Sequence, residues 1–194
     1  QEANLQGANL QGANLQGANL QGANLQEANL QEANLQETCF NGAILDSANL
    51  SNAKLIKAQI SLSLQLEINQ KVASLRNAIL QGADLSQANL DGANLIKANL
   101  TDSNFYMSSL SGADLNMANL NNTNFKHSVL RKTNLERTDL TEASFLGADL
   151  TDTSFIGATI AATNLTEALL SGSNISDSQL GLAIIIKPKK IIAS

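Results

Sequence analysis

A large apolar residue recurs every five residues through almost all of this 194-residue chain. Leu, Phe or Ile occupies every residue number that is a multiple of five, from 5 to 60 and again from 75 to 180. Ala, Ser or Thr stands two residues before each of them, and only Gln65 and Gln70 break the series. Helices repeat at about 3.6 residues and strands at about 2, so neither is the main element of this chain.

Glycine marks a second regular position in the unit. Eleven of the twelve glycines fall two residues after a large apolar residue. Glycine is favoured where the chain turns sharply or φ is positive, and the Asn or Asp before most large residues also suits tight turns. One turn per five residues, with one large and one small residue pointing inward, predicts a square coil of twenty residues.

The phenylalanines fit a coil of this length. Phe105, Phe125 and Phe145 are spaced by twenty residues, and all three stand at the large inward position. In a twenty-residue coil they would form one core column on one wall, where offset ring packing is favourable.

The repeated A(N/D)LxG-like unit, plainest in the four QGANL copies at 6–25, resembles the pentapeptide repeat family, familiar from cyanobacteria. The resemblance covers thirty-four units, or about 170 of the 194 residues. It implies an all-β fold, a right-handed quadrilateral parallel β-helix. The length then gives about nine coils of four five-residue faces, stacked into a rod roughly 45 Å long.

We expect one domain, with the β-helix at 1–180 and a capping tail at 181–194. An irregular break falls at 61–74, where the apolar residues 62, 64, 66 and 68 alternate as in a strand. The break is either a distorted coil of one continuous helix, which we favour, or a junction between two arrays. In the tail, residues 184–186 are three isoleucines that could cover the apolar end of the last coil.

Few residues suit catalysis or cofactor binding. His127 is the only histidine and is expected to face solvent, and the lone Cys39 is expected to be a surface thiol. No base partner is apparent for the many Ser and Thr residues, and the glycines form no phosphate-binding motif. We therefore expect no enzyme, no metal site and no cofactor.

Composition limits the partners. A net charge of −5 and a pI near 4.8 disfavour direct nucleic-acid binding, because phosphates need Lys and Arg. No stretch approaches the roughly twenty apolar residues of a membrane span, so we expect a cytoplasmic protein without membrane contact. The first coil would present an open strand edge, which favours end-to-end self-association unless it is capped.

Some members of the family mimic the shape and charge of DNA and bind DNA gyrase, which would require acids gathered on one side of the rod. A coil of twenty residues predicts which acids share a side. Two adjacent walls of residues 75–180 then carry a net charge of −4, and the same walls of residues 1–60 carry −3. The acids in the first group are Asp84, Asp102, Glu142, Asp149 and Glu167, and those in the second are Glu2, Glu27 and Asp46.

These eight acids are sparse. Along a rod of roughly 45 Å they give roughly one charge per 6 Å, whereas DNA carries one per about 1.7 Å. The favoured interpretation is a noncatalytic structural or protein-interaction rod whose specific function the sequence leaves open. The alternative is a DNA mimic that binds gyrase and inhibits or protects it, with the first five acids as its contact face.

Overall fold

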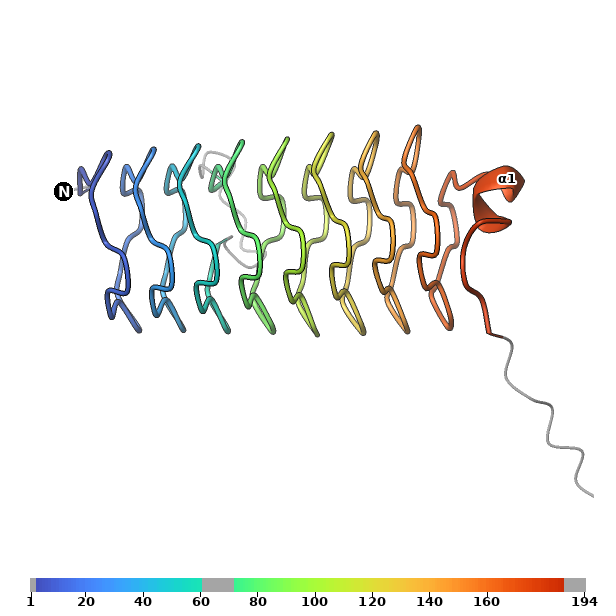
Figure 1. Ribbon diagram of the computed structural model, residues 1–194, viewed down its shortest axis with the longest axis horizontal. Coiled ribbons are helices and arrows are strands. Elements are labelled where there is room, and N and C mark those ends of the chain that lie inside the picture. The colour runs from blue at the N-terminus through green and yellow to red at the C-terminus, as the bar shows by residue number, and fades with distance from the viewer. Residues whose placement is uncertain (1–2, 61–71, 187–194) are drawn as a thin grey trace, which may run out of the picture.

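The chain winds into a rod of stacked coils, as Figure 1 shows for the computed structural model, which describes residues 3–60 and 72–186. Successive coils are joined by isolated parallel β-bridges between residues twenty apart, such as Asn4 with Asn24 and Asn104 with Asn124. Four bridged residues alternate with four turns in each coil, so every five-residue unit supplies one side and one turn. The molecule is a solenoid.

Each unit turns at the two residues that follow its large apolar residue. In the first turn the Ala8 N–H donates to the Leu5 carbonyl at 3.0 Å. The third residue of each such turn has a φ between 54° and 70°, while the second residue is not left-handed, which is the type II pattern. Glycine fits this position without strain, yet twenty other residues adopt the same φ.

Backbone hydrogen bonds join each coil to both neighbours. The Leu5 N–H donates to the Asn24 carbonyl at 2.7 Å, and the Asn24 N–H donates back to the Ala3 carbonyl at 2.9 Å. The Asn at the bridged position also bonds locally, since the Asn4 Oδ1 accepts from the Gln6 N–H at 3.2 Å. The preference for Asn and Asp before the large residue therefore follows from the turn.

The large and small positions of the unit fill the interior. Phe105 stacks on Phe125, and Phe125 on Phe145, with ring centroids 4.9 Å apart in both pairs and interplanar angles of 19° and 3°. Where Thr replaces Ala at the small position, its hydroxyl bonds to the backbone, as when Thr123 donates to the Leu100 carbonyl at 2.9 Å. A buried hydroxyl is tolerated when it is satisfied in this way.

The register of the coils changes between residues 60 and 72. The bridges there join residues thirty apart instead of twenty, as between Ile44 and Ser74 and between Lys54 and Asp84. Residues 3–60, the first array, therefore stack directly on residues 72–186, the second array, with ten additional residues in one coil. The expected break lies mostly at 61–71, outside the described residues.

The C-terminal end departs from the coil pattern. The short helix α1 (Asp177–Leu180) begins with a capping box formed by Ser176 and Gln179. The Gln179 side chain also donates to two carbonyls of the preceding coil, Phe155 at 3.1 Å and Ala158 at 3.0 Å. Residues 184–186 are 45–65% exposed, and the apolar contacts at this end come from Ile175, Leu180 and Ala183.

Candidate functional site

The residues with the most reactive side chains are dispersed. His127 is exposed at a turn, and the half-buried Cys39 accepts from the Asn41 side chain at 3.3 Å. Within residues 3–60 and 72–186, no three His, Cys, Asp or Glu side chains converge as metal ligands. The same part of the chain contains no helix long and apolar enough to cross a membrane.

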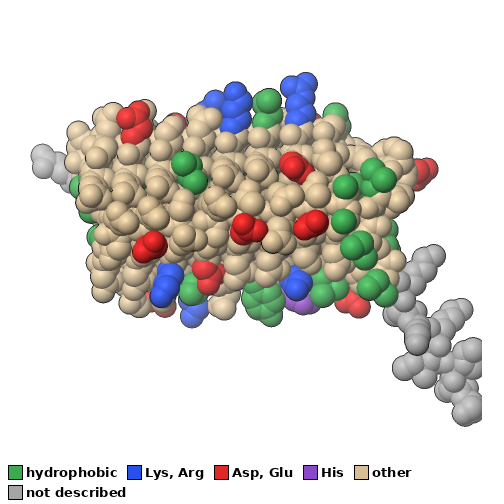
Figure 2. Space-filling model, viewed as in Figure 1, with side chains coloured by type: hydrophobic (Ala, Val, Ile, Leu, Met, Phe, Trp, Pro, Cys, Tyr) green, Lys and Arg blue, Asp and Glu red, His purple; other side chains and the backbone are tan. Residues whose placement is uncertain are grey.

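The five acids of the predicted contact face lie on different parts of the surface. Asp102 and Glu142 are exposed on one corner of the coils, two coils apart, and the ladder through Asn122 connects them. Glu167 is exposed on the next corner, and the half-buried Asp84 lies on the side between these two corners. Figure 2 shows acids on the visible face that are separated from one another by neutral atoms.

Asp149 is the most enclosed of the five, with 9% of its surface exposed. Its carboxylate pairs with the Arg131 Nε at 2.5 Å and accepts from the Thr151 hydroxyl at 2.6 Å and the Thr151 N–H at 3.1 Å. Burial raises the pKa of Asp149, but these hydrogen bonds and the Arg131 charge outweigh it and hold the pKa below its ordinary value. Asp149 therefore contributes little negative field to the surface.

The acidic side predicted for residues 1–60 is wrong in one respect. Glu27 and Asp46 do not continue the wall of Asp102 and Glu142, because the ten additional residues rotate the numbering by half a coil. Backbone hydrogen bonds place Asp46 and Arg76 on the same corner, with Glu27 one coil before them. The eight predicted acids therefore do not lie together on one side of the rod.

A more concentrated set of interaction-prone side chains lies on the corner that follows the phenylalanine column. Two consecutive residues of three successive coils form it: Tyr106 with Met107, Lys126 with His127, and Leu146 with the residue after it. We call these six residues the Tyr106 ridge. Backbone bonds fix its spacing, from the Met107 N–H to the Lys126 carbonyl (3.1 Å) and from the His127 N–H to the Leu146 carbonyl (2.9 Å).

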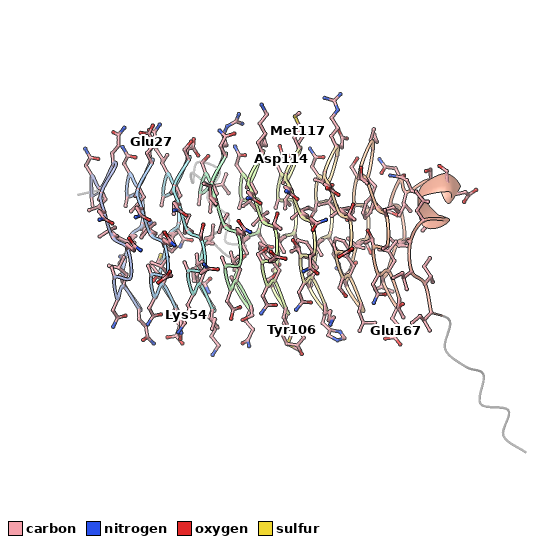
Figure 3. The ribbon with its side chains drawn as sticks, viewed as in Figure 1. Glu27, Lys54, Tyr106, Asp114, Met117 and Glu167 are labelled. Atoms are coloured by element: carbon pink, nitrogen blue, oxygen red, sulfur yellow. The ribbon has the colours of Figure 1, made fainter. Side chains whose placement is uncertain are left out.

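The only tyrosine and the only histidine of the chain contact each other on this ridge. The Tyr106 and His127 rings meet edge to face with centroids 5.9 Å apart. On its other side the His127 ring lies over Gly147, where an added Cβ would come within 2.7 Å of the His127 Nδ1. Met107 beside them is 53% exposed, and Figure 3 shows Tyr106 on the lower long edge of the rod.

The core behind the ridge is the aromatic part of the interior. Each of Phe105, Phe125 and Phe145 directly precedes a ridge residue, so the stacked rings support the three coils that present it. Tyr and Met are enriched at the centres of protein interfaces, and charged residues are depleted there. The ridge can offer apolar and aromatic contacts together with one cation, Lys126.

Sequence reasoning missed the ridge, although a signal was present. Folding the numbering at twenty places Tyr106, Lys126 and Leu146 in one outward column and Met107 and His127 in the next. Among the outward residues, the sequence prediction applied this folding only to the charged ones, so the neighbouring apolar side chains were not compared.

The geometry defines a repeat protein, a solenoid built from five-residue units whose distinguishing side chains lie on its outside. The family model for pentapeptide repeats matches residues 3–42, 28–63, 73–105, 108–147, 118–155 and 148–184. The chain therefore belongs to the pentapeptide repeat family. No curated protein matches the sequence.

Solved structures of pentapeptide repeat proteins resemble this one. HetL, involved in heterocyst differentiation regulation in the cyanobacterium Nostoc, is 30% identical, with a TM-score of 0.60 over 95% of this chain and 90% of HetL. QnrB1, a plasmid-mediated fluoroquinolone resistance protein, is 19% identical over 84% of this chain and 95% of its own, with a TM-score of 0.47. A protein of the Arabidopsis thaliana thylakoid lumen is 24% identical over 82% of this chain and 72% of its own, with a TM-score of 0.25.

Proposed function

We propose that this chain is a noncatalytic rod that binds a protein partner in the cytoplasm through the Tyr106 ridge. The observation that carries the proposal is the packing of His127 between Tyr106 and Gly147 on an exposed corner. Solvated turns need no aromatic pair, whereas a rigid and partly apolar ridge is suited to the desolvated centre of an interface. HetL, which is similar over most of its length, is itself involved in a regulatory process.

The proposal includes the finer description of the fold. The rod is a right-handed quadrilateral parallel β-helix of about nine coils, and the twenty-residue spacing of its bridges supports this. The backbone hydrogen bonds between successive coils keep the ridge side chains in register. A partner would therefore meet a preformed surface and pay little ordering entropy on binding.

The alternative, gyrase binding by DNA mimicry, has less support. Of the five predicted acids, Asp149 is paired with Arg131, and Glu167 stands on a different corner from Asp102 and Glu142. DNA presents one negative charge per about 1.7 Å of axis. A surface on which the exposed acids stand whole coils apart is a weak imitation of it.

The test compares two double variants by affinity capture from a lysate of the source organism, followed by quantitative mass spectrometry. Tyr106→Ala with His127→Ala alters the ridge, while Asn121→Ala with Asn122→Ala changes equivalent turn positions on another corner. We expect at least one protein to be retained by the wild type and the control but to fall about tenfold or more with the ridge variant. The identified protein is then purified and its affinity for all three chains measured.

Equal retention by all three chains would overturn the proposed site. The gyrase alternative is examined in parallel with purified gyrase in a supercoiling assay. Inhibition, or protection from a quinolone, that disappears with Asp102→Asn and Glu142→Asn but persists with the ridge variant would favour DNA mimicry in place of the ridge.

A further inference from the structure

Over four successive coils, a different corner of the rod carries its acidic residues before its basic ones. Glu27 and Asp46 occupy it in two successive coils of the first array, and Arg76 and Lys97 occupy it in the next two coils. We call these four residues the split edge. Backbone hydrogen bonds join the four coils. The Glu27 N–H donates to the Asp46 carbonyl (3.0 Å), the Ser47 N–H to the Arg76 carbonyl (2.8 Å) and the Asn77 N–H to the Ile96 carbonyl (3.0 Å).

The charges at the two ends of the split edge are open to solvent. Glu27 and Lys97 are both exposed, whereas Asp46 and Arg76 are half-buried. Asp46 accepts from the Ser74 hydroxyl at 2.5 Å and from the Arg76 N–H at 3.1 Å, through one carboxylate oxygen. Within the described ranges the split edge contains no ion pair.

The register change creates this arrangement. The ladder crosses from the first array to the second with an offset of thirty residues, so the corner of Glu27 and Asp46 continues as the corner of Arg76 and Lys97. With an offset of twenty, Lys97 would have been placed on the diagonally opposite corner, beyond Glu37 and Lys57. The ten additional residues therefore place the acidic pair Glu27 and Asp46 directly before the basic pair Arg76 and Lys97 on one corner.

A corner with this order of charges is complementary to itself in one direction only. A second rod lying antiparallel, with the two-fold axis between the coils of Asp46 and Arg76, would bring Asp46 to the partner's Arg76 and Glu27 to the partner's Lys97. Each contact occurs twice, because a two-fold interface is isologous. A parallel second copy would instead bring like charges together.

The geometry points to a second copy of this chain as the partner of the split edge, bound side by side and antiparallel. Exposed ion pairs are individually weak and are screened by salt, so the association is weak and depends on ionic strength. Figure 3 shows Glu27 and Met117 on one long edge of the rod and Tyr106 and Glu167 on the opposite one. The dimer thus leaves both Tyr106 ridges free, and the inference does not depend on the proposed function.

The experiment is sedimentation velocity over a concentration series at about 20 mM and about 300 mM salt, where the Debye lengths differ several-fold. The single variants Glu27→Lys and Lys97→Glu each change an exposed turn residue, so both are expected to fold, which circular dichroism checks. We expect each to raise the dimer dissociation constant about fivefold or more, and the combined variant to restore it to within about twofold. Glu32→Lys, an equal charge change on another corner, is expected to have no such effect.

Mixing the two single variants provides the decisive arm. Glu27→Lys leaves only basic residues at positions 27 and 97, and Lys97→Glu leaves only acidic ones, so each chain should pair with the other and not with itself. Wild-type protein that remains monomeric at about 0.5 mM in low salt would overturn the inference. The inference would also be overturned if Glu27→Lys and Glu32→Lys weakened the dimer equally, or if the two single variants failed to associate when mixed.

Discussion

The two arrays have the same backbone and carry different surfaces. Both repeat the same turn, the same ladder and the same buried positions. The first array presents mainly Gln, Asn, Gly and Glu, while the second holds the stacked phenylalanines and the Tyr106 ridge. The inward positions and the turn residues are therefore enough to set this fold, and the remaining outward side chains are free to differ between coils.

The largest effect is expected from emptying the core of the second array. Phe125→Ala should lower the free energy of unfolding by about 3–5 kcal/mol, because the ring leaves a cavity and loses two stacked neighbours. Leu30→Ala, at the equivalent position of the first array, should cost about 2–4 kcal/mol. Urea denaturation followed by circular dichroism measures both. If Phe125→Ala is at least as stable as Leu30→Ala, the ring stack contributes no additional stability.

A smaller effect distinguishes two glycines with nearly the same φ. Gly12 has a φ of +64° and open space around its Cα, whereas Gly147 has a φ of +65° and lies under His127. Gly12→Ala should cost about 1 kcal/mol from backbone strain alone. Gly147→Ala should cost about 1 kcal/mol more, because its Cβ displaces the imidazole.

The same denaturation measurement includes His127→Ala as the control for this glycine pair. In the His127→Ala background the additional cost at Gly147 should disappear, since nothing then lies above the new methyl group. If the two glycine variants are equally destabilised with His127 present, the imidazole does not pack on Gly147.

The left-handed turn positions offer a third comparison. Five of the eleven in the first array are glycine, against six of the twenty in the second, so more strain remains in the second. Lys132→Gly should stabilise the protein by about 0.5 kcal/mol, since relief of left-handed strain exceeds the entropy cost of glycine. Lys132→Val should cost about 1 kcal/mol or more, because a β-branched side chain suits this φ poorly. Equal stability of the two variants would contradict this account.

The sequence predicted the repeat architecture well, for a physical reason. Each five-residue unit makes its own turn and buries its own Leu and Ala, so local pattern and global fold agree. The family prediction is confirmed. The register change escaped prediction because ten extra residues preserve a frame of five while shifting a frame of twenty by half a turn, so Glu27 and Asp46 were assigned to the wrong side.

The surface was predicted less completely than the fold. The loss of Asp149 from the acidic set depends on a contact eighteen residues away, with Arg131, which only the stacking of coils brings close. The Tyr106 ridge depends on the same stacking. Spacing along the chain shows which outward residues share a corner, but not which side chains then pair, and those pairs decide the charge that remains.

The smallest effect expected concerns the pH dependence of the Asp149–Arg131 pair. The folded-state pKa of Asp149 lies below its ordinary value, so the stabilisation it contributes is present above the unfolded-state pKa, near 3.8, and is lost as the pH falls through the folded-state value. Wild-type protein should therefore lose stability in acid more steeply than Asp149→Asn, with the two curves converging once the pH falls below the folded-state pKa. Asp102→Asn, an exposed acid of the second array, is the matched control and should leave the acid limb of the curve close to that of the wild type. If Asp149→Asn and Asp102→Asn give the same acid limb, Arg131 and Thr151 do not stabilise the ionised carboxylate, and Asp149 would again belong with the acids available to a partner.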